Sequence, residues 1–160
     1  MLTLAGLMRD ALSSEADAPL SFAKVRVYQQ GEITLFPGEF CYGSNNPAAI
    51  HAATTGFSIF STTKRVGMPE TRDIDGKYNE FVIPAGIHVT VMLQWEAELN
   101  GVTVSCGPTG ATFFPAYGRS YDVSASNNAC NLLIREIYEA APGKVEIAAV
   151  QTSYSFACAY

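Results

Sequence analysis

The sequence predicts an all-β protein, an antiparallel β-sandwich preceded by a short N-terminal helix. Short segments in which apolar and polar residues alternate recur along the chain. Turn signals rich in glycine, proline and asparagine separate these segments about every ten residues, as in sandwiches and barrels. The four cysteines are an even number, which suits a fold cross-linked by disulfides. A length of 160 residues fits one domain with a core of its own.

The N-terminal region has the period of a helix rather than of a strand. Its apolar residues fall on one helical face, and Thr3 can cap the first turn. These residues are Leu4, Leu7, Met8, Ala11 and Leu12. Residues 13–19 are polar and end in proline. We therefore expect a helix and linker over residues 1–19 and the β-sandwich over residues 20–160.

From residue 24 the period changes to two. Residues 24–28 and 33–36 alternate on either side of Gln29-Gln30-Gly31, which predicts a hairpin. Residues 42–55 and 67–76 are rich in turn formers and are expected to be loops, whereas residues 57–60 form a short strand candidate.

The second half of the chain continues this pattern. Strands are expected over residues 78–83 and 87–99, and Asn100-Gly101 is the strongest hairpin signal in the sequence. Residues 102–106, 111–114 and 121–125 follow as short strands. Residues 130–137 alternate as a strand, although residues 132–138 also fit a helix, and alternation returns within residues 145–160.

The cysteines indicate an oxidising compartment, because disulfides persist there. None is spaced Cys-x-x-Cys, which disfavours a zinc ribbon or a thioredoxin-like site. The alternative is four buried free thiols in a cytosolic protein. Four cysteines allow three pairings. We expect Cys106–Cys130, which flank a compact Gly-Pro and Phe-Phe-Pro unit, and then Cys41–Cys158 by elimination.

Composition and charge exclude some classes of partner. Charged residues make up 16% of the chain, below the usual value of about 25%. The net charge of −5 argues against nucleic acid, since phosphate binding needs an excess of lysine and arginine. There is no apolar stretch of about 20 residues, so no membrane span is expected. A surface with so few charges suggests contact with a protein partner or self-association.

Catalytic signals are weak. His88 lies within an alternating strand, where a solvent-facing or hydrogen-bonded role is expected. His51 can be combined on paper with a loop serine and Asp73 or Asp75, but nothing resembles the strand–turn–helix around a nucleophile.

Carboxylates give no stronger signal. Residues 73–76 have a faint calcium-loop pattern, yet the ligand positions of a true loop are missing and the segment fits a turn. Glu96 and Glu98 fit the solvent side of a strand. No catalytic residue, cofactor or metal site is therefore predicted.

Aromatic residues carry the best functional signal. The chain has 8 tyrosines and 9 phenylalanines, several of them in turn segments. Tyrosine is enriched at the centres of protein interfaces. We expect the turn residues Tyr42, Phe114, Tyr117 and Tyr121 to form a contact surface, with residues 67–76 nearby. The alternative is that these rings cap the ends of the sandwich.

Several segments together resemble a group of known proteins. They are Val-Arg-Val-Tyr at 25–28, Leu-Phe-Pro-Gly at 35–38, residues 64–71, residues 78–86, and residues 106–123 with their Cys-Gly-Pro start. This pattern resembles small uncharacterised exported proteins, often lipoproteins, of Gram-negative bacteria, and it covers about residues 25–137. The resemblance implies a β-sandwich in the cell envelope and no particular activity. The chain departs from it at Leu7, where a lipid-bearing cysteine is expected, and in the tail with Cys158.

These observations predict a non-catalytic binding protein of the bacterial cell envelope. An immunity-type inhibitor of a secreted toxin and an adaptor on an envelope machine are two forms of this function. The alternative is a small hydrolase acting on cell-wall or sugar substrates. The expected location is periplasmic or outer-membrane associated, although residues 1–8 lack the basic start and the length of an export signal.

Overall fold

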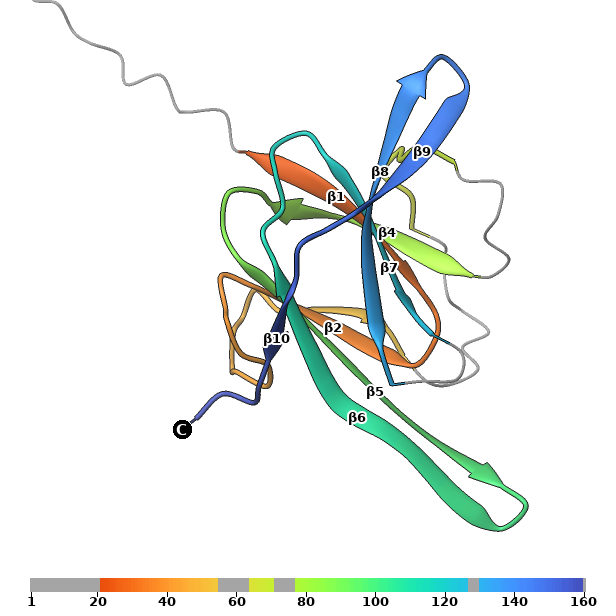
Figure 1. Cartoon of the computed structure of the whole chain (residues 1–160). Coiled ribbons are helices and arrows are strands. Elements are labelled where there is room, and N and C mark those ends of the chain that lie inside the picture. Colours follow the sequence, from red (N-terminus) through yellow and green to blue (C-terminus); the bar gives the residue numbers. More distant parts are fainter. Residues whose placement is uncertain (1–20, 55–63, 71–76, 127–129, 160) are drawn as a thin grey trace, which may run out of the picture.

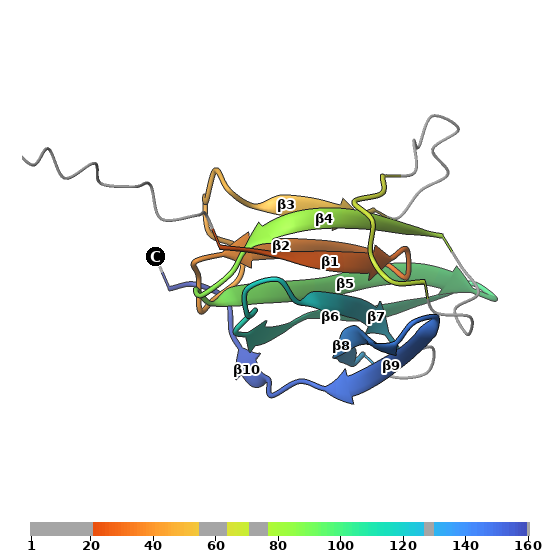
Figure 2. The same ribbon diagram turned by 90° about the horizontal axis from the view of Figure 1, so that it is seen from above.

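The computed structural model describes residues 21–54, 64–70, 77–126 and 130–159, and over these the chain is all-β (Figure 1). Two five-stranded sheets pack face to face, which confirms the predicted β-sandwich architecture (Figure 2). The expected N-terminal helix and the strand candidate over residues 57–60 lie outside the described residues. No helix among the described residues is long and apolar enough to cross a membrane.

Each sheet mixes strands from distant parts of the sequence. Sheet A has the order β4 (Tyr78–Pro84), β1 (Phe22–Tyr28), β7 (Ser120–Ala125), β8 (Leu132–Ala141) and β9 (Lys144–Ala149). Sheet B has the order β10 (Ser153–Ser155), β6 (Val102–Phe113), β5 (Val89–Leu99), β2 (Glu32–Pro37) and β3 (Ile50–Ala53).

The core lies between the sheets and follows directly from the period of two. Alternate residues of each inner strand point toward the opposite sheet and are fully buried. They include Val25, Val27 and Ile83 from sheet A, and Val89, Val91 and Leu93 from sheet B. Burying one such side chain stabilises the fold by about 1.5–3 kcal/mol.

The sheets are not purely antiparallel, which corrects one part of the predicted fold class. β1 runs parallel to β7, with Lys24 opposite Ser120 and Val27 opposite Val123. Parallel neighbours need a long crossover between them. Here the connection contains four strands of sheet B and β4 of sheet A, because the chain visits both sheets between β1 and β7.

The hairpin expected from residues 24–36 is also wrong. β1 pairs with β4 and β7, whereas β2 pairs with β3 and β5 in the other sheet. Gly31 makes this passage possible, since its φ of 108° is unfavourable for other residues and a Cβ there would crowd Leu93 and Trp95. The pattern predicted both strands correctly but not their partners. Part of the expected loop over residues 42–55 is β3.

The turn prediction at Asn100-Gly101 is confirmed. Asn100 and Gly101 have φ values of 52° and 78° and join β5 to β6, as expected for an Asn-Gly hairpin. Pro142-Gly143 joins β8 to β9. The strand predicted over residues 130–137 corresponds to β8, so the helical alternative is wrong.

The structure contains two disulfides, with the expected pairing. Cys106–Cys130 joins β6 of sheet B to the chain just before β8 of sheet A. Cys41–Cys158 joins the loop after β2 to the tail after β10. Both bonds are compatible with an oxidising, extracytoplasmic environment.

Candidate functional site

Three loops meet at one end of the sandwich. They follow β2 (residues 38–41), connect β4 to β5 (residues 85–88), and connect β6 to β7 (residues 114–119). Backbone hydrogen bonds tie them together. The Gly38 N–H donates to the carbonyl of His88 at 2.7 Å, and the Gly86 N–H donates to the carbonyl of Pro115 at 2.9 Å. The Gly118 N–H donates to the carbonyl of Phe22 at 2.9 Å and so fixes the third loop to β1.

The side chains on these loops form a largely exposed ring cluster. The imidazole of His88 packs against the ring of Phe40 at a tilt of 42°, with 3.8 Å between ring centroids, and contacts Phe114 edge-on at 5.0 Å. Phe40 is nevertheless 64% exposed and Phe114 54% exposed. Tyr117, which is 68% exposed, and the exposed Ile87 project from the same loops. We call Phe40, Ile87, His88, Phe114 and Tyr117 the aromatic end.

Hydrogen bonds from neighbouring strands to the backbone carbonyls of Glu39 and Phe40 hold Phe40 in place. The Thr90 hydroxyl donates to the carbonyl of Glu39 at 2.6 Å and is also 2.7 Å from the hydroxyl of Thr112. The Ser155 hydroxyl donates to the carbonyl of Phe40 at 2.6 Å. The next residue, Cys41, is in a disulfide. The Phe40 ring is therefore carried by a backbone that is fixed on both sides.

An open pocket of about 350 Å³ lies beside the ring cluster. One wall is formed by His88 and residues 112–114, and the other by residues 150–153, where the chain passes from β9 to β10. Ring faces, hydroxyls and backbone groups line it together. This combination can receive one apolar or amphipathic side chain of a protein partner.

The structure brings together only two of the four residues predicted to contact a partner. Phe114 and Tyr117 belong to the aromatic end. Tyr42 is half-buried, its ring packs against Gly110, and its hydroxyl donates to the carbonyl of Pro108 at 3.3 Å. The backbone of Tyr42 also pairs with the tail on both sides of Ala157. Tyr42 therefore anchors the C-terminal tail.

Tyr121 is a core residue, which corrects its predicted contact role. It is 3% exposed, and its ring meets Phe113 at 5.1 Å. Its hydroxyl accepts a hydrogen bond from the Ala116 N–H at 2.8 Å. Burial raises the pKa of this phenol. Tyr121 thus supports the loop that carries Phe114 and Tyr117 from underneath.

The sequence does not assign two central members of the cluster to a contact surface. It places Phe40 in a turn segment, and it predicts His88 to be an ordinary strand residue. Both follow turn signals, Pro37-Gly38 and Ala85-Gly86, which place them at strand ends. Only the sheet pairing shows that these two strand ends are neighbours.

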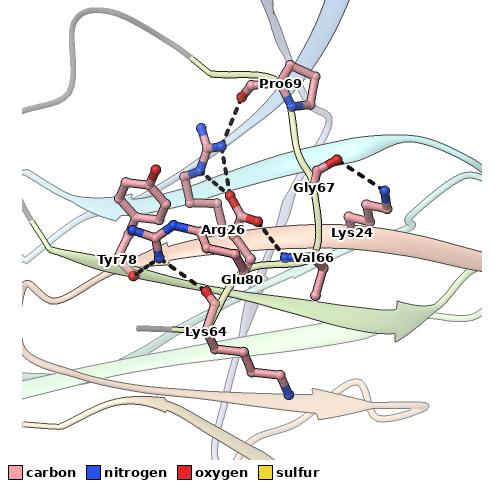
Figure 3. A network of polar contacts seen from close by, with 9 residues as sticks. Lys24, Arg26, Lys64, Val66, Gly67, Pro69, Tyr78 and Glu80 are labelled. Carbon is pink, nitrogen blue, oxygen red and sulfur yellow. Dashed lines mark hydrogen bonds and ion pairs between the residues drawn. The ribbon is translucent and has the colours of Figure 1, made fainter. Parts of the chain in front are cut away.

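Of the residues 67–76 expected beside this surface, residues 67–70 are described, and they lie elsewhere. Together with residues 64–66 they cross the outer face of sheet A (Figure 3). There Arg26 donates to a carboxylate oxygen of Glu80 at 2.9 Å and to the carbonyl of Pro69 at 2.9 Å. The second oxygen of Glu80 accepts from the Val66 N–H at 2.7 Å. This segment, which we call the strap, is bound to a buried ion pair far from the ring cluster.

The ion pair belongs to a row of alternating charges across four strands. Glu80 of β4 faces Arg26 of β1, Arg26 faces Asp122 of β7, and Asp122 faces Arg135 of β8. The first three side chains are buried. Arg135 donates to one Asp122 oxygen at 3.0 Å, and the other Asp122 oxygen has no hydrogen-bond partner among the described residues.

The two carboxyl groups respond to burial in opposite ways. Burial alone would raise the pKa of Glu80, but hydrogen bonds from Val66 and Arg26 outweigh it and lower that pKa. Burial raises the pKa of Asp122, and the attraction of Arg135 and Arg26 offsets only part of that effect. The row positions the strap and joins the strands of sheet A.

Residues considered for catalysis are dispersed. His51 is exposed on β3, where its Nδ1 lies 3.2 Å from the hydroxyl of Thr34. Asp73 and Asp75 lie outside the described residues. Within the described part of the chain, no three histidine, cysteine, aspartate or glutamate side chains are grouped as a metal site.

No family model matches the chain, and comparison with curated proteins and with solved structures gives no match. Function is therefore inferred from the surfaces of the molecule.

Proposed function

We propose that this protein is a non-catalytic binding protein of the bacterial cell envelope, and that it holds a protein partner at its aromatic end. The observation that carries the proposal is the closely packed and largely exposed ring group of Phe40, His88 and Phe114. Exposed apolar surface costs free energy in water, and clusters of it mark interaction sites.

The arrangement favours binding because the rings are already ordered. Side chains that must be immobilised on association reduce affinity by about 0.5–1.5 kcal/mol each. Here the contact with His88 and the hydrogen bond from Ser155 to the Phe40 carbonyl reduce that cost in advance. The adjoining pocket gives a partner side chain a place to insert.

The envelope location is supported by the two disulfides. The net charge of −5 disfavours nucleic acid and thereby favours a protein as the partner. An immunity-type inhibitor of a secreted toxin and an adaptor on an envelope machine would both use such a surface. The identity of the captured partner separates these two forms.

Site-specific photo-crosslinking in cells tests the proposal. A photoreactive phenylalanine analogue replaces Tyr117, and in a second strain it replaces Tyr154 as the control. Tyr154 is equally suitable for labelling because it is 87% exposed on β10, on the opposite side of that strand from the buried Ser155.

We expect one discrete protein adduct from position 117 and none of the same mass from position 154. The additional substitution Phe114→Ala should abolish that adduct. Equal adducts from both positions, or an adduct that survives Phe114→Ala, would place the contact elsewhere.

A further inference from the structure

The opposite end of the molecule carries a second unusual surface. The β5–β6 hairpin continues beyond the body of the sandwich and ends at Asn100-Gly101 (Figure 1). Pairing between β2 and β5 stops at Glu32 opposite Gln94. We call residues 95–105, which project past this pair, the arm.

The arm has one apolar face and one acidic face. In its register, Ala97 lies opposite Val104 and Leu99 opposite Val102, and these four side chains share a face with Trp95. Leu99 is 60% exposed and Val102 is 62% exposed. The apolar face continues the core-facing side of β5 past the end of the sandwich.

The other face of the arm carries carboxylates. Glu96 lies opposite Ser105 and Glu98 opposite Thr103, and Glu32 lies at the base of the same face. Among the described residues, no ion pair includes any of these three glutamates. The acidic face therefore has no counter-charge within that part of the chain.

The edge of β5 in the arm is open. Between residues 95 and 99, β5 pairs with β6 on one side, and no described strand pairs with it on the other. An open strand edge offers backbone N–H and C=O groups to another extended chain. Two-stranded ribbons are also only marginally stable alone, so an added strand would reinforce the arm.

We propose that the arm binds an extended segment of another protein, in which basic and apolar residues alternate, by strand addition to the open edge of β5. Successive side chains of the added strand point to opposite faces. Its basic side chains therefore lie beside Glu96 and Glu98, and its apolar side chains extend the face that contains Leu99. A second copy of this chain is a poorer occupant, because it would bring the same carboxylates and a net charge of −5.

A synthetic peptide tests this chemistry without knowledge of the natural partner. The probe is an acetylated and amidated peptide of about eight residues in which lysine or arginine alternates with valine. The controls are a peptide of identical composition with all basic residues first, and one with glutamate in place of every basic residue. Fluorescence anisotropy gives the affinity of the full protein for each.

We expect the alternating basic peptide to bind about tenfold more tightly than the block peptide, and the acidic peptide not to bind. Glu96→Gln with Glu98→Gln should weaken binding about fivefold and reduce its salt dependence. Leu99→Thr should also weaken it. Glu70→Gln in the strap and Leu133→Thr in β8 are the control substitutions, and they should leave the affinity unchanged.

Methylation of the peptide backbone separates strand addition from a loose charge contact. In an added strand, the N–H groups of only one alternating set point at β5. We expect N-methylation of one set, either the basic residues or the valines, to abolish binding. N-methylation of the other set should have a clearly smaller effect. Equal effects of the two sets, or equal binding of the block peptide, would overturn the proposal.

Two further measurements test the occupant of the arm and its independence from the aromatic end. A protein that sediments as a dimer and becomes monomeric with Leu99→Thr would show a second copy on the arm and overturn the proposed occupant. Phe114→Ala should not change peptide affinity, so the arm and the aromatic end are tested separately.

Discussion

At the scale of single residues, the rings at the aromatic end have two roles. Exposed rings are available to contact a partner, and a buried ring supports the loop that carries them. Phe114 and Tyr117 expose more than half of their surface, whereas Tyr121 directly beneath their loop is buried. The phenol of Tyr121 holds the loop through the Ala116 N–H. Truncating an exposed ring should affect binding, and altering the buried one should affect stability.

Tyr121→Phe keeps the ring and removes the hydroxyl. We expect a loss of about 1 kcal/mol in the free energy of unfolding, because the Ala116 N–H loses its acceptor. Urea denaturation measures this loss, with Tyr117→Phe as the control that should change stability little. Equal stability of the two variants would show that the hydroxyl does not support the loop.

The buried charges predict a pH dependence with opposite signs for two carboxyl groups. The folded pKa of Glu80 lies below its ordinary value of 4.5. Its contribution to stability is therefore present above pH 4.5 and lost as the pH falls through the folded pKa. Glu80→Gln should cost about 3 kcal/mol at pH 7, since Arg26 is left buried without its counter-charge, and less in acid.

The contribution of Asp122 to stability changes with pH in the opposite direction to that of Glu80. The folded pKa of Asp122 lies above the ordinary value of 3.8, so its contribution is full below pH 3.8 and is lost as the pH rises through the folded pKa. The stability of Asp122→Asn relative to the native chain should therefore increase with pH. Denaturation from pH 3 to pH 7 measures both variants, and parallel trends would contradict the assignment.

At the scale of elements, the sequence predicts strands better than it predicts their partners. The period of two identifies β1, β2 and β5, because a strand with one buried face must alternate. It does not identify the sheet to which each strand belongs, since both sheets present the same apolar pattern to one core. For this reason β1 and β2 look like a hairpin and lie in different sheets.

The residues of a turn predict its structure where the turn requires backbone angles that few residue types adopt. Asn100-Gly101 predicts its hairpin because both residues adopt positive φ, which Asn and Gly tolerate best. The aromatic end has no comparable local signal. Phe40, His88 and Phe114 come from three loops that lie far apart in the sequence, and only the pairing of β2, β5 and β6 brings them together.

The two disulfides differ in the length of chain that they close and in their position relative to the aromatic end. The closed loops correspond to sequence separations of 24 for Cys106–Cys130 and 117 for Cys41–Cys158. Loop-entropy estimates give about 3.5 and 5 kcal/mol of stability respectively. Replacing each pair by alanine should lower the melting temperature, and more so for the longer loop.

Only removal of Cys41–Cys158 should also weaken partner capture, because it frees the chain next to Phe40. The comparison of crosslinking yield in the two double variants tests this difference. Loss of capture in both variants would attribute the effect to general destabilisation.

At the scale of the whole molecule, the two surfaces lie at opposite ends of one sandwich. β5 connects them, since it begins beside His88 and ends in the arm. The ends also differ in chemistry: one presents closely packed rings, and the other an acidic and apolar ribbon with an open edge. This separation suits a protein that joins two partners, as an envelope adaptor does.

The affinity of the crosslinked partner for the native chain and for Phe114→Ala tests the central claim most directly, when melting temperatures are measured on the same samples. We predict a loss of about 2 kcal/mol in binding free energy, roughly 30-fold in Kd, with an almost unchanged melting temperature. An unchanged Kd together with a clearly lower melting temperature would contradict the account, because Phe114 would then stabilise the fold and not the complex.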